Sequence, residues 1–232
     1  MSDSYKYNPW PLGHISKSKQ RPDLELLKKA GYKFEDPREV VDIFERKVAE
    51  FSGSKYAIAV DCCSHGLFLC LKYLDARGEI SIPKQTYVSV PLQILHAGCQ
   101  IKFTDEKWNG SYQLKPYPIY DSAVKWTKNM YTEGFEVLSF QIKKRIPIGK
   151  GGMILTDDAD AANWFRKARY DGRDLTIPYP DNVYKILGWH YYMTPEDAAR
   201  GILLMDSTPE INPDIANWEN YPDLSHHEVF DA

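Results

Sequence analysis

Short apolar segments of strand length alternate with helical segments through most of this 232-residue chain. Helical spacing of apolar residues occurs at 67–74 and 86–97, and again from about residue 158 to about residue 169. A strand–helix–strand order favours parallel pairing with helices on both faces. The pattern therefore predicts an α/β fold with a mostly parallel sheet flanked by helices. Its strands are expected at residues 56–60, 79–82, 101–103, 117–120, 135–140 and 153–156.

The first long helix has clear boundaries in the sequence. Asp36 is a good N-cap, Pro37 suits the first helical position, and Glu39 stands where a capping box has its acid. Apolar residues follow at helical spacing as far as Phe51, and Gly53 is a typical C-terminal stop. The helix is expected to lead directly into the first buried strand.

Charge and hydropathy exclude several classes of protein. Lys and Arg number 29 and Asp and Glu 32, a net charge of −3, so nothing in the bulk charge favours nucleic-acid binding. No apolar run approaches the ~20 residues of a membrane helix, and the first residues lack the apolar stretch of a secretion signal. The four cysteines have the spacing of neither a zinc site nor a disulfide framework. A reducing, cytoplasmic location without membrane contact is expected.

Composition also divides the chain into three regions. Residues 1–35 are polar and carry prolines, and they are expected to form an arm on the surface. Residues 36–205 carry the alternating pattern and are expected to form the α/β domain. Residues 206–232 are acidic and rich in Pro and Asn, so an acidic tail with little core is expected there.

Polar residues gather where three predicted strands end. These are the turn at 61–66, Asp121, and the segment 139–145. Ligands of open α/β sheets bind beyond the carboxyl ends of strands, so the three groups are expected to converge. Two interpretations stay open: Ser64 either caps a helix or binds phosphate, and Asp121 either caps the next segment or serves catalysis or a metal. Lysines of the third group are either solvated or catalytic.

Two glycines stand between this basic segment and the last predicted strand. Glycine lacks a Cβ atom, and Gly151-Gly152 directly before a strand therefore suggests a tight backbone crossing.

Five segments occur in a recognisable order within residues 38–205. They read FERKVAEFSGSKYAIAV, SIPKQTYVSVPLQILHAGCQIKFTD, YDSAV, SFQIKKRIPIGKGGMILTDD and LGWHYYMTPEDAA. In this order they resemble the DegT/StrS-type sugar aminotransferases, which use pyridoxal phosphate (PLP). The resemblance implies the aspartate-aminotransferase-like fold of PLP-dependent transferases, with the C-terminal small domain reduced or absent.

The resemblance assigns roles by position. Lys144 lies five residues after Ser139, which is the family's spacing for the Schiff-base lysine, and Lys143 is only its neighbour. Asp121 would face the pyridine nitrogen and keep it protonated, and Tyr87 would stack on the pyridine ring. The residues that would hold the phosphate are Ser139, Ser64, Cys63 and His65.

Two further residues match family positions near the cofactor. Gln141 stands where the family usually has a histidine beside the cofactor. His190 stands where an asparagine often reaches the phosphate from a second subunit. A homodimer with shared active sites is expected, because the chain is small for enclosing a cofactor and a nucleotide sugar alone.

The implied activity is transfer of an amino group from an amino acid, expected to be glutamate, to a keto sugar. The sugar is expected to be nucleotide-linked, as in amino-sugar and polysaccharide biosynthesis. A related dehydratase branch has histidine in place of Lys144, so the lysine favours transamination. Two alternatives remain. The chain is either a reduced homologue that binds PLP or sugar with little turnover, as a binding or assembly subunit, or a structural interaction protein without a cofactor.

Overall fold

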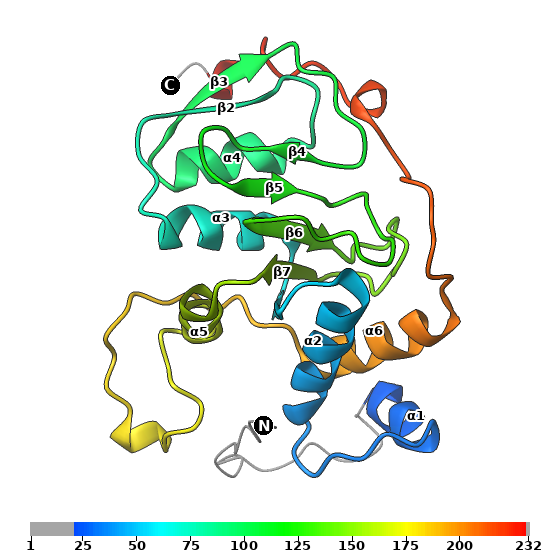
Figure 1. The fold of residues 1–232 in the computed structure, drawn as a ribbon. Helices are drawn as coiled ribbons and strands as arrows, with labels where there is room; N and C mark the ends of the chain where they lie inside the picture. Colours follow the sequence, from blue (N-terminus) through cyan, green and yellow to red (C-terminus); the bar gives the residue numbers. More distant parts are fainter. Residues whose placement is uncertain (1–20, 231–232) are drawn as a thin grey trace.

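The computed structural model describes residues 21–230. Its regular elements follow one another as shown in Figure 1. The helices are α1 (Asp23–Lys29), α2 (Glu39–Ser52), α3 (Cys63–Tyr73), α4 (Ser89–His96), α5 (Ala159–Ala168) and α6 (Pro195–Ser207), with short 3₁₀ turns at Tyr179–Asp181, Trp218–Asn220 and Glu228–Phe230. The strands are β1 (Tyr56–Val60), β2 (Glu79–Pro83), β3 (Gln100–Thr104), β4 (Tyr112–Gln113), β5 (Ile119–Asp121), β6 (Phe135–Ser139) and β7 (Gly152–Thr156).

The strands form one five-stranded sheet and one adjoining pair. The sheet has the order β1-β7-β6-β5-β4, and β2 and β3 pair in parallel beside it. An antiparallel bridge between Ser81 of β2 and Lys115 joins the pair to the residues that follow β4. Both backbone hydrogen bonds of this bridge are present, at 2.8 and 3.1 Å. The pair therefore continues the sheet beyond β4.

The α/β class is confirmed, but the expectation of a mostly parallel sheet is wrong. Of the strand pairs, β5–β6 and β2–β3 are parallel, while β1–β7, β6–β7 and β4–β5 are antiparallel. A parallel connection needs a crossover of about a dozen residues or more, usually a helix. Only residues 114–118 separate β4 from β5, and the loop between β6 and β7 contains no helix. The chain therefore reverses direction at both places.

Helices cover both faces of the sheet and make two hydrophobic layers. In β1, Ile58 and Val60 belong to the layer under α3 and α5, whereas Ala57 and Ala59 belong to the layer under α2 and α6. Alternation along a strand sends successive side chains to opposite faces. Because both faces are buried, the strand is apolar throughout, as expected for a central strand covered by helices.

The predicted C-terminal boundary of α2 is confirmed, whereas the helix begins at Glu39 with Arg38 in the N-cap position, later than the predicted cap at Asp36. The backbone N–H of Asp36 donates to the Glu39 carboxylate at 3.0 Å, and Asp36 in turn accepts from the backbone N–H of Arg38 at 2.8 Å. At the other end Gly53 adopts a left-handed conformation with φ of 83°, which a glycine tolerates without a Cβ penalty. Asp36 and Glu39 thus order the turn that precedes the helix, and Gly53 ends it.

Segments outside residues 36–205 also take defined positions. Residues 1–20 of the predicted arm lie outside the described residues, and α1 from the same region packs against α6 through the buried Leu27. In the predicted tail, Leu224 and Phe230 are buried.

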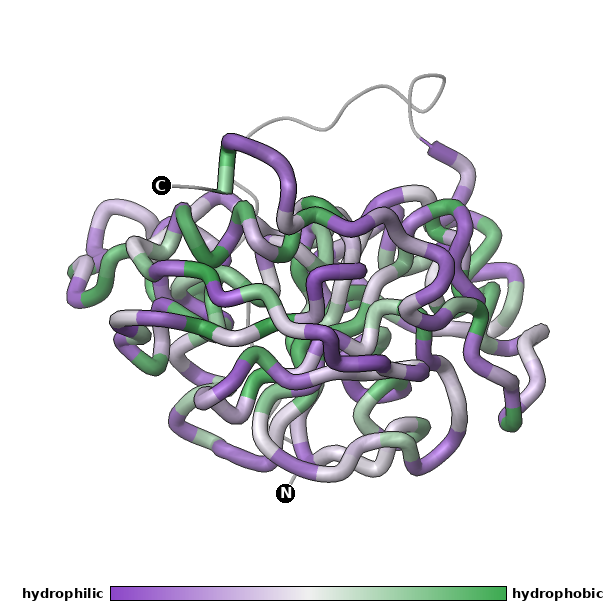
Figure 2. Tube along the Cα trace, turned by 90° about the horizontal axis from the view of Figure 1, so that it is seen from above, coloured by the Kyte–Doolittle hydropathy of each residue, from purple (hydrophilic) through white to green (hydrophobic). Residues whose placement is uncertain are grey.

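Hydrophobic and hydrophilic residues are interspersed along the coloured trace in Figure 2. Among residues 21–230, no helix has the length and apolar character that crossing a bilayer requires.

A buried ion pair joins α2 to the end of α5. Glu45 and Arg169 are only 4% and 6% exposed, and the Arg169 guanidinium donates to the Glu45 carboxylate. Glu45 also accepts from the backbone N–H of Ala59 at 2.9 Å, and Arg169 also donates to the Ala59 carbonyl at 2.6 Å. The pair therefore ties both helices to β1.

Replacing Glu45 with alanine is expected to lower the free energy of unfolding by about 3–5 kcal/mol, because the substitution leaves the Arg169 charge buried without its carboxylate. Urea denaturation of the purified variant measures the change. The matched control is Glu79→Ala, which breaks the exposed pair with Lys102 and should cost less than about 1 kcal/mol. Equal losses in the two variants would contradict the prediction.

Candidate active site

A cavity of about 590 Å³ opens at the edge of the sheet where β5 and β6 end. The N-terminus of α3 and the first residues after β2 form part of its wall. Its lining includes seven of the nine site residues predicted from the sequence, which are Lys144, Asp121, Tyr87, Ser139, Ser64, Cys63 and Gln141. Three groups that lie far apart in the sequence therefore meet at one place, as expected.

Asp121 ends β5 in the buried part of the cavity and is 6% exposed. Its carboxylate accepts hydrogen bonds from the Tyr112 hydroxyl at 2.7 Å and from the backbone N–H of Ala123 at 3.0 Å. Burial raises the pKa of Asp121, and these hydrogen bonds and the positive charge of Lys144 offset the effect only in part. A positively charged N–H donor bound beside this buried carboxylate would therefore stabilise its negative charge further.

Tyr112 and Thr86 form a chain of hydrogen bonds that ends on the Asp121 carboxylate. The Tyr112 hydroxyl is shared between the Asp121 carboxylate and the Thr86 hydroxyl, and both supporting residues are buried. Sequence reasoning missed both of them. Tyr112 lies in the 105–116 connection, whose composition indicates only turns, and nothing in the local pattern marks it as a partner of Asp121.

The turn after β1 presents backbone donors to the cavity. Cys62 is the N-cap of α3, and its sulfur accepts from the backbone N–H of His65 at 3.4 Å. The capping interpretation of Ser64 is therefore wrong: its hydroxyl instead pairs with the Ser89 hydroxyl at 2.6 Å. The first N–H groups of a helix lack partners within the helix, so this N-terminus offers donors to an anion.

The side chain of Cys63, in the first turn of α3, points toward the Asp121 carboxylate. Its sulfur lies 3.8 Å from the Asp121 carboxylate and 3.7 Å from the Val137 carbonyl. Burial and the nearby Asp121 charge raise the pKa of the Cys63 thiol well above its ordinary value. The thiol therefore stays protonated at neutral pH and acts as a packing residue and weak donor rather than as a nucleophile.

The tight backbone crossing predicted at the paired glycines is confirmed. A Cβ atom on Gly152 would lie 2.5 Å from the Cys63 nitrogen and 2.6 Å from the Cys62 carbonyl carbon. Gly151 has φ of 136° and forms a bridge with Cys62. The absence of side chains at these glycines lets β7 lie against the turn that carries the helix N-terminus.

The basic segment after β6 forms a turn at the mouth of the cavity. The backbone N–H of Lys144 donates to the Gln141 carbonyl at 2.8 Å, and the N–H of Lys143 donates to the Gln141 side chain at 2.9 Å. Both lysines and Lys150 line the cavity. The Lys144 charge also acts on the pKa of Asp121, so these two groups face a common space.

Two predicted residues lie elsewhere. His65 is outside the lining, stacked on Tyr191 with ring centroids 3.7 Å apart and bonded to Asp61 at 2.6 Å. Burial, the largest single effect, would lower its pKa, but the hydrogen bonds and charges of Asp61 and Cys62 together outweigh it and raise the pKa of His65 to about 9. His190 is exposed and pairs with Asp171 at 2.8 Å. Neither side chain faces this chain's own cavity.

The residues around the cavity fit a phosphorylated pyridine. A buried carboxylate with a raised pKa suits a protonated ring nitrogen, and a primary amine at Lys144 suits an aldehyde. The α3 N-terminus, with the Ser64 and Ser139 hydroxyls, is a donor set for a phosphate. The close packing of Gly152 against Cys62 and Cys63 holds that N-terminus at the cavity, so its position as well as its chemistry fits a phosphate.

Comparison with curated proteins identifies a bacterial relative. The chain is 28% identical over 230 residues to the spore coat polysaccharide biosynthesis protein SpsC of Bacillus subtilis, covering 79% of this chain and 57% of the relative. The chain thus spans little more than half of that protein's length.

Solved structures share the fold at lower identity. The match to AtS13 from Actinomadura melliaura has a TM-score of 0.68 at 19% identity and covers 80% of this chain and 65% of AtS13. The match to PseC of Helicobacter pylori, an aminotransferase involved in pseudoaminic acid biosynthesis, has a TM-score of 0.63 at 15% identity. It covers 81% of this chain and 63% of PseC. The match to 3-amino-5-hydroxybenzoic acid synthase has a TM-score of 0.67 at 17% identity. It covers 88% of this chain and 64% of the synthase.

A family model also matches most of the sequence. It is the DegT/DnrJ/EryC1/StrS aminotransferase family, matched at residues 29–130 and 128–213, which include the sheet, the glycine crossing and most of the cavity lining. Enzymes of this family use pyridoxal phosphate, in agreement with the donor set around Asp121 and Lys144. The chain belongs to the DegT/DnrJ/EryC1/StrS aminotransferase family.

Proposed function

We propose that this chain binds pyridoxal phosphate and transfers an amino group from an amino acid to a keto sugar. The observation that carries the proposal is the meeting of Lys144 and the buried Asp121 in one cavity beside the N-terminus of α3. When bound, pyridoxal phosphate supplies a ring that withdraws electrons from the carbon attached to the transferred nitrogen. Family membership supports the same chemistry.

In this proposal each residue has a separate task. Lys144 holds the cofactor and moves a proton between donor carbon and cofactor carbon. Asp121 keeps the ring nitrogen protonated, and Tyr87 stacks on the ring. Gln141 borders the cofactor at the turn before Lys144. The α3 N-terminus, Ser64 and Ser139 hold the phosphate.

The substrates in this proposal are glutamate and a nucleotide-linked keto sugar. Lys143 lines the cavity and gives it positive charge, which suits a diphosphate group or an α-carboxylate, whereas Lys150 in the same lining pairs with Asp61 at 3.1 Å. The similarity to a polysaccharide biosynthesis protein supports a sugar as acceptor. The molecule would act in the cytoplasm as a homodimer, with His190 of each subunit serving the other's phosphate site.

Purified protein incubated with pyridoxal phosphate tests the proposal by visible absorption. We expect a new band from the bound cofactor, which glutamate removes while 2-oxoglutarate accumulates. Addition of a nucleotide-linked keto sugar should restore the band and yield an amino sugar. Absence of any band would overturn the proposal. A band that no amino acid removes would instead support the binding or assembly subunit.

A further inference from the structure

Residues 208–224, here called the strap, cross the edge of the sheet where the cavity opens. They leave α6 and run up beside the ends of β4, β5 and β6, as the orange to red segment of Figure 1 shows. Four residues of the strap contribute to the cavity lining, and these are Ile215, Ala216, Asn220 and Tyr221. The strap therefore closes one side of a cavity whose other sides come from the α/β core.

Backbone hydrogen bonds fix the first half of the strap. Lys128 donates through its backbone N–H to the Glu210 carbonyl at 2.8 Å, and the Arg145 guanidinium donates to the Pro213 carbonyl at 2.8 Å. Ile215 then donates to the Val124 carbonyl at 3.3 Å. Because the partners come from the segments that follow β5 and β6, the strap is held against the rim of the cavity itself.

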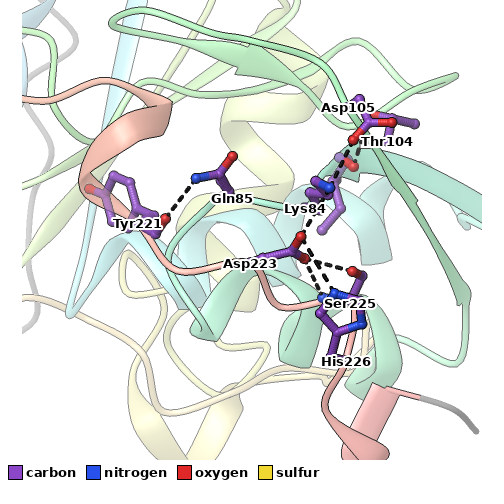
Figure 3. A network of polar contacts seen from close by, with 9 residues as sticks. Lys84, Gln85, Thr104, Asp105, Tyr221, Asp223, Ser225 and His226 are labelled. Carbon is purple, nitrogen blue, oxygen red and sulfur yellow. Dashed lines mark hydrogen bonds and ion pairs between the residues drawn. The ribbon is translucent and has the colours of Figure 1, made fainter.

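A polar network fixes the second half, as Figure 3 shows. The Lys84 ammonium pairs with Asp223 of the strap at 3.0 Å and with Asp105 at 2.9 Å. The Gln85 side chain donates to the Tyr221 carbonyl at 3.1 Å, and the N–H of Leu224 donates to the Lys84 carbonyl at 2.9 Å. The backbone of Tyr221 is thus clamped beside the end of β2.

The side chain of Tyr221 faces the groups proposed to surround the cofactor. Its ring lies 5.6 Å from the Trp108 ring, and its hydroxyl has no hydrogen-bond partner within residues 21–230. Burial, followed by the negative charge of Asp121, raises the pKa of Tyr221 to about 12. The hydroxyl therefore stays protonated at neutral pH and can donate to an acceptor in the cavity.

We infer that the strap is a wall of the cofactor subsite and that Tyr221 is a further cofactor-contacting residue, whose hydroxyl donates to a polar atom of bound pyridoxal phosphate. This inference rests on the proposed function, because it assumes that pyridoxal phosphate is the ligand beside Asp121. The unpaired hydroxyl, its place among Asp121, Cys63 and Tyr87, and the clamped backbone carry the argument.

Cofactor affinity and release rate test the inference. Tyr221→Phe removes only the hydroxyl and should raise the dissociation constant for pyridoxal phosphate about 3–10-fold, measured by titration of the visible band. Lys84→Met cuts the network of Figure 3 outside the cavity and should speed cofactor release about two- to fivefold. The matched controls are Tyr184→Phe, at an exposed tyrosine, and Lys102→Met, which breaks an ion pair that does not involve the strap.

The outcomes separate this inference from the proposed function. If wild-type protein gives no band with pyridoxal phosphate, the proposed function fails. If wild-type protein gives the band but Tyr221→Phe and Lys84→Met bind and release the cofactor like their controls, the inference is overturned and the proposed function stands. Circular dichroism and thermal melting of each variant confirm that any weakened binding occurs in folded protein.

Discussion

Lys144→Ala is expected to lower the rate of amino transfer by about 10²–10⁴-fold and to remove the visible band given by pyridoxal phosphate. The proposed role requires a primary amine that both holds the cofactor and carries a proton, and no neighbouring group replaces both tasks. Lys144 lines the cavity and its charge acts on Asp121, so the amine and the carboxylate serve the same space. Rates and spectra of the purified variant measure the effect.

Lys143→Ala is the matched control for this substitution. Lys143 also lines the cavity and belongs to the same turn, so the two variants lose the same charge from nearly the same place. A role in charge alone predicts equal effects on the band. The proposed roles instead predict that Lys143→Ala keeps the band and raises mainly the KM of the substrates, because Lys143 contributes only positive charge to the cavity. If Lys143→Ala lost the band and Lys144→Ala kept it, Lys143 and not Lys144 would be the residue that holds the cofactor.

Asp121→Asn is expected to lower turnover by about 10²–10³-fold while leaving the protein at least as stable as wild type. The substitution removes the charge that would keep the ring nitrogen protonated, but it preserves the shape of the side chain. Its amide can donate to the Tyr112 hydroxyl, which can then donate to Thr86, so the buried hydrogen bonds survive. Steady-state kinetics and thermal melting on the same preparation measure both effects.

Tyr112→Phe provides the comparison for Asp121→Asn. It removes a hydrogen bond to the carboxylate and keeps the charge, so turnover should fall much less than in the asparagine variant. A stability loss in Asp121→Asn that matches its activity loss would show that the carboxylate serves the fold, and it would argue against the proposed contact with the ring nitrogen.

Several features of this protein follow from local sequence alone. The C-terminal limit of α2 depends on Gly53, and the turn just before its first residue depends on the contact between Asp36 and Glu39, all within a few residues. Gly151-Gly152 indicated the backbone crossing because only the absence of a side chain permits such an approach. Asp121 and Lys144 were proposed through the resemblance to a family, because the local pattern alone left a capping carboxylate and a solvated lysine open as alternatives.

Tertiary structure decided the partners of those residues. Tyr112 meets Asp121 because β4 pairs antiparallel with β5 through a short connection, a pairing that the alternating pattern did not indicate. Ser64 turns toward Ser89 and Cys62 takes the capping position, although serine is the residue type preferred at an N-cap. Tyr221 reaches the cavity only because Lys84 and Gln85 clamp a segment far along the chain. Local sequence determines helix ends and tight turns, whereas contacts between distant segments depend on how strands pair and which side chains then share a buried space.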